Sequence, residues 1–323
     1  MTVDEWWDLW RRDPRATPFQ SPAWAEAWWA ELGGGERIDL ESRDGCGRLI
    51  GILPTFVWHD EGTRKLVPVG AGHSDYLDAL IDPEQAEAAI AGLWAAAGAA
   101  DARWDQVLLR DLRPDSPLLG PLPDGWAAED APCEICPVLD LPAGVPLERI
   151  ISKSHRRKVQ HDRLRAERFG DVVTSTATRN EIPEALDALF ALHAERWAAE
   201  GQAGVLADIR VQAFHRRAAP ALHDAGLLRM ALVRHEGRVV TVLLGFADRH
   251  RRYSYINGVA FTPGQSFGTL AFALLIEAAV AEGAEAFHFL RGEEEYKYRW
   301  GARPVRTVKR VVRLRGNGCA ARA

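Results

Sequence analysis

The chain has 323 residues, 47% of them hydrophobic, and a formal net charge of −5 at pH 7. This length exceeds that of a typical single domain, so we expect two domains, each with a packed core. The negative net charge excludes a protein that binds DNA through its overall charge, although local basic patches can still attract anions.

Six of the twelve tryptophans lie before residue 30, on two predicted amphipathic helices. These helices cover residues 3–12 and 22–32, and Ser21 is the expected N-cap of the second. Tryptophans four residues apart share a helix face, which predicts core packing or a domain interface. A wall for an apolar substrate is the alternative. The N-terminus has no signal-peptide pattern, and no apolar run is long enough to span a membrane, so we expect a cytoplasmic protein.

The rest of the first half is predicted to be rich in strands. A hairpin joins residues 37–42 to 48–58 through a glycine turn, and a third strand follows at 64–69. The later predicted elements are, in order, a polar glycine loop at 70–76, a helix at 83–100, a strand at 106–109, a Pro/Gly-rich loop at 114–130 and a strand at 135–141.

The cysteines give no metal or redox signature. Cys133 and Cys136 form a lone CxxC pair, whereas a zinc site needs two more ligands. A redox motif is expected at the start of a helix, but this pair opens a predicted strand. We therefore expect reduced cysteines and no metal.

A basic helix is predicted over residues 147–169, after a linker at 142–146. It contains eight lysines and arginines, together with His155 and His161. Such a run is typical of a solvated helix face, and binding of an anionic partner is the alternative. The scarcity of aromatic residues argues against stacking on single-stranded nucleic acid.

The second half alternates strands and helices. The predicted elements are, in order, a strand at 171–178, helices at 181–200 and 208–225, a hairpin of strands at 227–234 and 238–246, a strand at 251–260, a helix at 269–282, a strand at 286–290 and a closing strand at 304–314. A frayed tail is expected at 316–323.

A glycine turn at residues 262–268 joins a predicted strand to a predicted helix. Free backbone N–H groups at such a turn point along the positive end of the helix dipole, an arrangement that holds phosphates. A short glycine turn is also a common connection between two elements, so the pattern alone leaves both interpretations open.

This region resembles the acyl-CoA N-acyltransferase (GNAT) fold. Gln265-x-x-Gly268 matches the first half of the turn that holds the CoA pyrophosphate, while Leu270 stands where a small residue is expected. The chain is more specifically similar to the CelD/BcsL-like branch, which is related to the Fem peptidyltransferases. That similarity rests on Pro18-Phe19-Gln20-Ser21-Pro22, Ser74-Asp75-Tyr76-Leu77-Asp78, Phe289-Leu290-Arg291-Gly292-Glu293 and Tyr296-Lys297-x-Arg299-Trp300-Gly301.

The resemblance implies an α/β (α+β) fold of tandem GNAT-like domains, with mixed central sheets flanked by helices. The expected domains are a degenerate one at 1–142 and an acyl-CoA-binding one at 147–315. The implied activity is transfer of an acyl group, acetyl foremost, from acyl-CoA to an amine of a small-molecule, sugar or peptide acceptor bound between the domains of a monomer or homodimer. The alternatives are a Fem-like transferase that uses aminoacyl-tRNA, favoured by the basic helix and disfavoured by the net acidity, and a non-catalytic scaffold or binding protein.

The resemblance also implies roles for individual residues. Tyr296 is the expected general acid, and Glu293, Glu295 or His288 the expected base. Favourable charge at a helix start explains the glutamates equally well, and His288 can instead be a core histidine. The implied acyl-CoA contacts are Ile256, Val259, Gly264, Gln265, Ser266, Gly268 and Thr269. The implied acceptor contacts are Asp75, Tyr76, Arg196, Trp197, Tyr255, Asn257 and Lys297, although Lys297 can simply pair with Glu293.

Overall fold

A computed structural model describes residues 1–315 and divides the chain into two compact units. The first unit contains Met1–Glu134 and the chain from Arg306 onward, and the second contains Ile135–Val305. The predicted tail at 316–323 lies outside the described residues. No helix within residues 1–315 is long and apolar enough to cross a membrane. Within the same range, no cluster of three or more His, Cys, Asp or Glu side chains could hold a metal ion.

The first unit combines a mixed sheet with three α-helices. The helices are α1 (Val3–Arg12), α2 (Pro22–Leu32) and α3 (Ala86–Ala99). The strands are β1 (Arg37–Arg43), β2 (Leu49–Asp60), β3 (Thr63–Pro68), β4 (Leu80–Ile81), β5 (Gln106–Leu112), β6 (Trp126–Asp140) and β12 (Arg303–Leu314). Their order in the sheet is β1-β2-β3-β5-β12-β6, with β4 beside β2. Alternating residues such as Ile38 and Leu40 face α3 and form the core with it.

Three of the six N-terminal tryptophans are buried in the core of the first unit, and the other three are partly exposed. Trp6, Trp24 and Trp28 are at most 4% exposed. The indole N–H groups of Trp6 and Trp24 donate to the Gln20 carbonyl oxygen at 2.9 Å and to Ser74 Oγ at 2.7 Å. Burial with satisfied N–H donors is what stabilises a tryptophan in a core.

Two strands differ from the prediction. β6 begins at Trp126, inside the stretch predicted to be a loop up to residue 130, because Trp126 packs on Trp94 and Trp104 in the core of the first unit. The strand predicted to close the second half is β12, but its residues 308–312 pair with β5 and belong to the first unit. Hydrophobic alternation predicts a strand without showing which neighbour completes its hydrogen bonds.

Arg310 on β12 stabilises the first unit through four hydrogen bonds. Its guanidinium donates to both Asp130 carboxylate oxygens at 2.7 Å and to the carbonyl oxygens of Leu118 and Gly120 at 2.7 and 2.8 Å. We predict that Arg310→Met lowers the free energy of unfolding by about 2–3 kcal/mol, because two carbonyls lose their charged donor. Urea denaturation measures this loss. The exposed neighbour substitution Arg313→Met is the control, and an equal effect of both variants would contradict the prediction.

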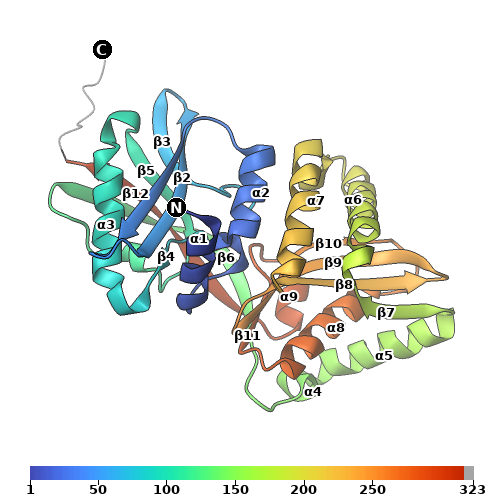
Figure 1. Ribbon diagram of the computed structural model, residues 1–323. Helices are drawn as coiled ribbons and strands as arrows, with labels where there is room; N and C mark the ends of the chain where they lie inside the picture. Colours follow the sequence, from blue (N-terminus) through green and yellow to red (C-terminus); the bar gives the residue numbers. More distant parts are fainter. Residues whose placement is uncertain (316–323) are drawn as a thin grey trace. The chain divides into compact units, whose positions relative to one another are not determined.

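The second unit is a mixed sheet covered by helices on both faces. Its strand order is β6-β11-β10-β9-β8-β7, with β7 (Val172–Thr176), β8 (Leu228–His235), β9 (Arg238–Ala247), β10 (Arg251–Val259) and β11 (Ala286–His288). Helices α6 (Ile182–Ala199) and α7 (Ile209–Asp224) cover one face, and α5 (Lys153–Phe169) and α8 (Phe267–Ala281) the other (Figure 1). The short helices α4 (Leu147–Ile150) and α9 (Glu295–Arg299) complete the unit.

The basic helix predicted over residues 147–169 is broken into α4 and α5. Ile151 and Ser152 adopt extended backbone angles, and Ser152 Oγ accepts a hydrogen bond from the His155 N–H at 3.1 Å. This side-chain cap starts a new helix at Lys153. The buried face of α5 carries His155, Val159, Asp162 and Ala166, so the remaining residues of the helix are exposed.

Strands β10 and β11 are parallel neighbours along only part of β10. Residues 251–253 pair with 286–288, after which β11 ends while β10 continues to Val259. The pairing of β10 with β9 shifts register between Ser254 and Ile256, which marks a bulge at Tyr255. The carboxyl end of β10 is therefore left without β11 beside it, at the edge where parallel strands commonly bind ligands.

Candidate functional site

A cavity of about 230 Å³ opens beside this unpaired end of β10. Asn257 and Val259 of β10 and Gly268 and Thr269 of α8 form one part of its lining. Helices α5, α6 and α9 supply the rest, so the cavity lies wholly within the second unit. It brings together part of the site expected from the sequence, namely Arg196, Asn257, Val259, Gly268, Thr269 and Tyr296.

Three cations line the cavity, and no carboxylate is among its lining residues. They are Lys158 of α5, Arg196 of α6 and Arg299 of α9, whose side chains are 43%, 54% and 52% exposed. Arg196 pairs with Glu200 at 3.7 Å and Arg299 with Glu295 at 2.9 Å, and exposed pairs of this kind are weak and readily exchange for another anion. Lys158 is held more firmly, because its Nζ lies 2.7 Å from the carboxylate of Asp162, which is 4% exposed. The cavity is therefore electrostatically suited to an anionic ligand.

The turn before α8 adds an anion-binding element next to these cations. Ser266 occupies the N-cap position, but its side chain makes no capping hydrogen bond. Lys158 Nζ lies 3.4 Å from Ser266 Oγ. The Arg165 guanidinium packs on Gly264, which has φ +78°, so closely that a Cβ there would lie 2.5 Å from Nη2. Two cations thus flank the positive end of the α8 dipole.

Tyr296 is held at the wall of the cavity by aromatic packing and one polar partner. Its ring lies 5.3 Å from that of Phe272, and its side chain is hydrogen-bonded to Asn257. Burial raises the pKa of Tyr296 above its ordinary value; Glu294 adds to the rise, while Arg196 and Asn257 oppose it. The phenol therefore keeps its proton at neutral pH and can donate it.

The geometry of β10 decides which of its residues reach the cavity. Gly258 faces α6, because a Cβ there would lie 2.9 Å from Leu192 Cβ. By strand alternation Ile256 shares that side, while Asn257 and Val259 point to the cavity. The bulge turns Tyr255 toward α7, where its ring lies 5.7 Å from that of His215. Four residues of β10 were predicted to belong to the site: Tyr255, Ile256, Asn257 and Val259. Of these, only Asn257 and Val259 line the cavity.

The predicted carboxylates Glu293 and Glu295 do not line the cavity, and neither does Lys297, which has a structural role. Lys297 is 3% exposed and donates to the carbonyl oxygens of Leu290, Arg291 and Gly292. Its charge pairs with Glu294 at 2.8 Å, whereas the sequence suggested Glu293. Glu295 pairs with Arg299 at 2.9 Å. The Lys297 ammonium thus stabilises the loop in which Leu290 and Gly292 have positive φ.

The other predicted site residues lie away from the cavity lining. His288 is 9% exposed on β11, with its ring 5.2 Å from that of Tyr253. Trp197 Nε1 donates to His193 Nε2 at 2.8 Å. Gln265 lies within the turn, and its N–H donates to the Thr262 carbonyl oxygen at 3.0 Å. Asp75 and Tyr76 belong to the first unit and are buried there, at 2% and 1% exposure.

Sequence reasoning did not assign several of the lining residues to a site. His155 and Lys158 were considered only as members of the basic run, and Phe272, Arg299 and Trp300 only as parts of a helix or a motif. A signal for His155 was nevertheless present, because Ser152 three residues earlier can start a helix at that point. The prediction of one continuous helix concealed it.

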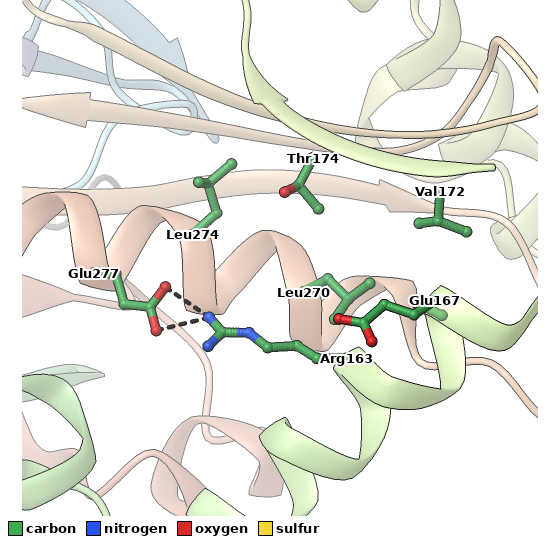
Figure 2. Close-up of a pocket in the computed structure, with 8 residues that line it drawn as sticks. Arg163, Glu167, Val172, Thr174, Leu270, Leu274 and Glu277 are labelled. Atoms are coloured by element: carbon green, nitrogen blue, oxygen red, sulfur yellow. Dashed lines mark hydrogen bonds and ion pairs between the residues drawn. The ribbon is translucent and has the colours of Figure 1, made fainter. Parts of the chain in front are cut away.

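A second cavity, of about 240 Å³, lies between α5, α8 and β7 (Figure 2). Leu270 and Leu274 of α8 face Val172 and Thr174 of β7, as Figure 2 shows. Its one cation is already paired, since Arg163 Nη2 contacts both carboxylate oxygens of Glu277 at 2.7 and 2.6 Å, and the remaining charged side chain, Glu167, is an anion. The first cavity, with its weakly paired arginines and its tyrosine, is therefore the candidate functional site.

Comparisons with known proteins give one family model and several similar folds. Residues 153–298 match the family model described as an acetyltransferase (GNAT) domain. Among solved structures, FemX is similar with a TM-score of 0.67 and 11% identity, over 97% of this chain and 96% of that one. No curated protein matches the sequence.

Two further solved structures are similar to this chain. The C-terminal domain of a putative synthetase from Agrobacterium fabrum has a TM-score of 0.60 and 12% identity, over 96% of this chain and 91% of that one. L-PGS from Bacillus licheniformis has a TM-score of 0.57 and 14% identity, over 92% of each chain. At such identities the likeness concerns the fold alone, and membership of the CelD/BcsL-like branch stays a prediction. The chain has the predicted mixed α/β, GNAT-like fold, and residues 153–298 match the model of a GNAT acetyltransferase domain.

Proposed function

We propose that the second unit transfers an acyl group, acetyl foremost, from acyl-CoA to the amine of a small-molecule, sugar or peptide acceptor. The observation that carries the proposal is the cavity itself. It combines the N-terminal end of α8, three cations without a lining carboxylate and a protonated tyrosine. The cations and the helix end suit an anionic donor, and the tyrosine can supply the proton that the leaving group needs.

The donor's phosphates would bind at residues 264–269. The positive end of the α8 dipole and the ammonium of Lys158 offer positive charge to a pyrophosphate, and Arg165 lies over the same turn. The thioester would then extend into the cavity along β10. Backbone N–H groups between Ile256 and Val259, which β11 leaves unpaired on that side, can polarise its carbonyl oxygen.

The reaction needs no covalent intermediate, because the thioester is already activated. The acceptor nitrogen attacks the thioester carbon, and the C–S bond breaks as the C–N bond forms. Tyr296 donates its proton to the departing sulfur, and Asn257 orients the hydroxyl for that transfer. Arg196, which acts electrostatically on Tyr296, would hold an acidic group of the acceptor or donor.

Calorimetric titration of the purified protein with acetyl-CoA and with longer acyl-CoAs tests the proposal. We expect a dissociation constant in the micromolar range, which corresponds to about −8 kcal/mol. We expect binding to weaken as the acyl chain grows, because the cavity holds only about 230 Å³. A folded protein that binds no acyl-CoA would overturn the donor assignment.

A Fem-like transferase that uses aminoacyl-tRNA is the second candidate. It is supported by the fold shared with FemX and by the exposed arginines of α5, including Arg157, Arg165 and Arg168. Binding to tRNA would weaken steeply with salt, since each neutralised phosphate releases counterions. Tight, strongly salt-dependent binding of aminoacyl-tRNA together with no affinity for acetyl-CoA would favour this candidate over the first.

A further inference from the structure

His155 stands out among the cavity residues because part of its imidazole is enclosed without a polar partner. The residue lies in the first turn of α5, where Ser152 fixes its backbone, and it is 8% exposed. Its ring lies 4.3 Å from that of Trp300, at an interplanar angle of 77°. Nε2 is shut off from solvent and has no hydrogen-bond partner. A buried polar atom without a partner is rare, and it invites a functional explanation.

The two ring nitrogens therefore have different environments. Nε2 is enclosed, whereas Nδ1 is not, so Nδ1 is the atom that a ligand in the cavity can reach. The perpendicular Trp300 ring is compatible with a proton on Nε2, because an N–H can point at an aromatic face. The neutral ring would then present the Nδ1 lone pair to the cavity.

The charges around the ring favour its neutral form. Burial is the main cause that lowers the pKa of His155, and Lys158 and Arg299 lower it further. Asp162 opposes them, but its carboxylate is only 4% exposed and is held by Lys158 Nζ at 2.7 Å. A lowered pKa means that the imidazole is unprotonated at pH 7 and gains its proton only as the pH falls. It is thus free to accept a proton at neutral pH.

We infer that His155 is the general base that takes a proton from the acceptor amine, through Nδ1. The inference rests on the proposed acyltransferase function and adds the group that activates the acceptor. The carboxylates expected from the sequence, Glu293 and Glu295, are not among the residues that line the cavity. Among the residues that line the cavity, His155 is the neutral side chain with a basic nitrogen.

The protons balance in two transfers. The acceptor enters as an ammonium ion and gives one proton to His155 Nδ1, which later releases it to solvent. The free amine attacks the thioester carbon, and the tetrahedral intermediate collapses with loss of the C–S bond. Tyr296 protonates the thiolate and regains its proton from the nitrogen of the new amide. The products are an amide, CoA with a free thiol and one proton.

The test compares His155→Gln with His161→Gln, an exposed histidine on the same helix whose side chain is 68% exposed. Acetyl-CoA is mixed with a panel of primary amines, and release of the CoA thiol is followed from about pH 4.5 to 9.5, a range that includes the region below the ordinary histidine value where a lowered pKa places the titration. We expect His155→Gln to lower kcat by about 100-fold and to remove the acidic limb of the pH profile. The KM for acetyl-CoA should change by less than about threefold, and His161→Gln should behave as the wild type.

Two further measurements separate catalysis from structure. In His155→Ala, added imidazole should restore part of the rate, which a purely structural role would not allow. The imidazole NMR signal that is missing from His155→Gln identifies His155 in the wild type. We expect this signal to shift when acetyl-CoA binds and to titrate below about pH 6.5, the ordinary histidine pKa.

The outcomes distinguish this inference from the proposed function. Wild type that binds no acetyl-CoA overturns both. Wild type that binds acetyl-CoA and transfers the acetyl group, with kcat and pH profile unchanged in His155→Gln, overturns the role of His155 alone. If no amine of the panel reacts, the NMR titration decides. If the NMR signal of His155 titrates with the ordinary histidine pKa and does not shift when acetyl-CoA is added, His155 is not part of the site.

Discussion

Replacing Tyr296 by phenylalanine is expected to slow acyl transfer by about 1,000-fold, within the range for loss of a positioned acid. The variant keeps the ring that packs on Phe272 and removes only the hydroxyl. Without that proton donor, sulfur must leave as a thiolate. Because the ring contacts persist, binding of acetyl-CoA should change by less than about threefold. Single-turnover release of the CoA thiol measures the chemical step, and calorimetry measures the binding.

The matched control for this prediction is Tyr298→Phe. Tyr298 lies on the same short helix but does not line the cavity, so its hydroxyl should be dispensable.

The raised pKa of Tyr296 also determines how the rate of acyl transfer should depend on pH. The tyrosine stays protonated until the pH exceeds its ordinary value, so it should not limit the rate at pH 9. Equal losses in both variants, or a fall in the rate of the wild type near pH 9 that Tyr296→Phe abolishes, would contradict the assignment.

Replacing Gly268 by glutamate is expected to weaken acetyl-CoA binding by more than about 100-fold, or about 2.8 kcal/mol. A Cβ at this position would lie 3.5 Å from Val259, an ordinary contact, so the backbone can accept the side chain. A carboxylate near the start of α8 is favourable for the helix itself. The loss of acetyl-CoA affinity should therefore come from the negative charge and bulk of the glutamate where the donor's phosphates would bind. The free energy of unfolding should change little.

The control places the same side chain at the other end of α8. Ala281 is the last residue of the helix and is exposed, so Ala281→Glu adds an equal charge far from the turn. Calorimetric titration with acetyl-CoA should then give a dissociation constant close to that of the wild type. If Gly268→Glu binds acetyl-CoA as tightly as Ala281→Glu does, the phosphates do not bind at this turn.

The segment from β10 to β11 was the most predictable part of the fold. Alternation in the strand, the breaks at Gly264 and Gly268 and the helical spacing of the leucines are all local signals. The prediction was wrong where a boundary depends on packing. Trp126 begins β6 because of Trp94 and Trp104, which are distant in sequence. The break between α4 and α5 depended on one serine cap within an otherwise continuous helical pattern.

The site was predictable in its location but only partly in its residues. The turn, Asn257 and Tyr296 were named from a resemblance, and Asn257 and Tyr296 come together in the structure. Tyr255 was named as well, but it is the extra residue of a bulge, which turns it toward α7. No local sequence pattern predicts that bulge. His155 lies more than a hundred residues before Tyr296, so only the folded chain reveals that both line one cavity.

The pairing of β12 with β5 has a consequence for the order in which the chain can fold. Residues 135–305 form the whole of the second unit, whereas the first unit includes residues from both sides of that stretch. During synthesis the second unit can therefore fold as soon as residues 135–305 have left the ribosome. The first unit must wait for residues 306–314, which bring Arg310 and the buried Val312 to its sheet. The N-terminal half, although made first, would be the last to reach its native state, and a truncation of the C-terminus would damage the unit that begins the chain.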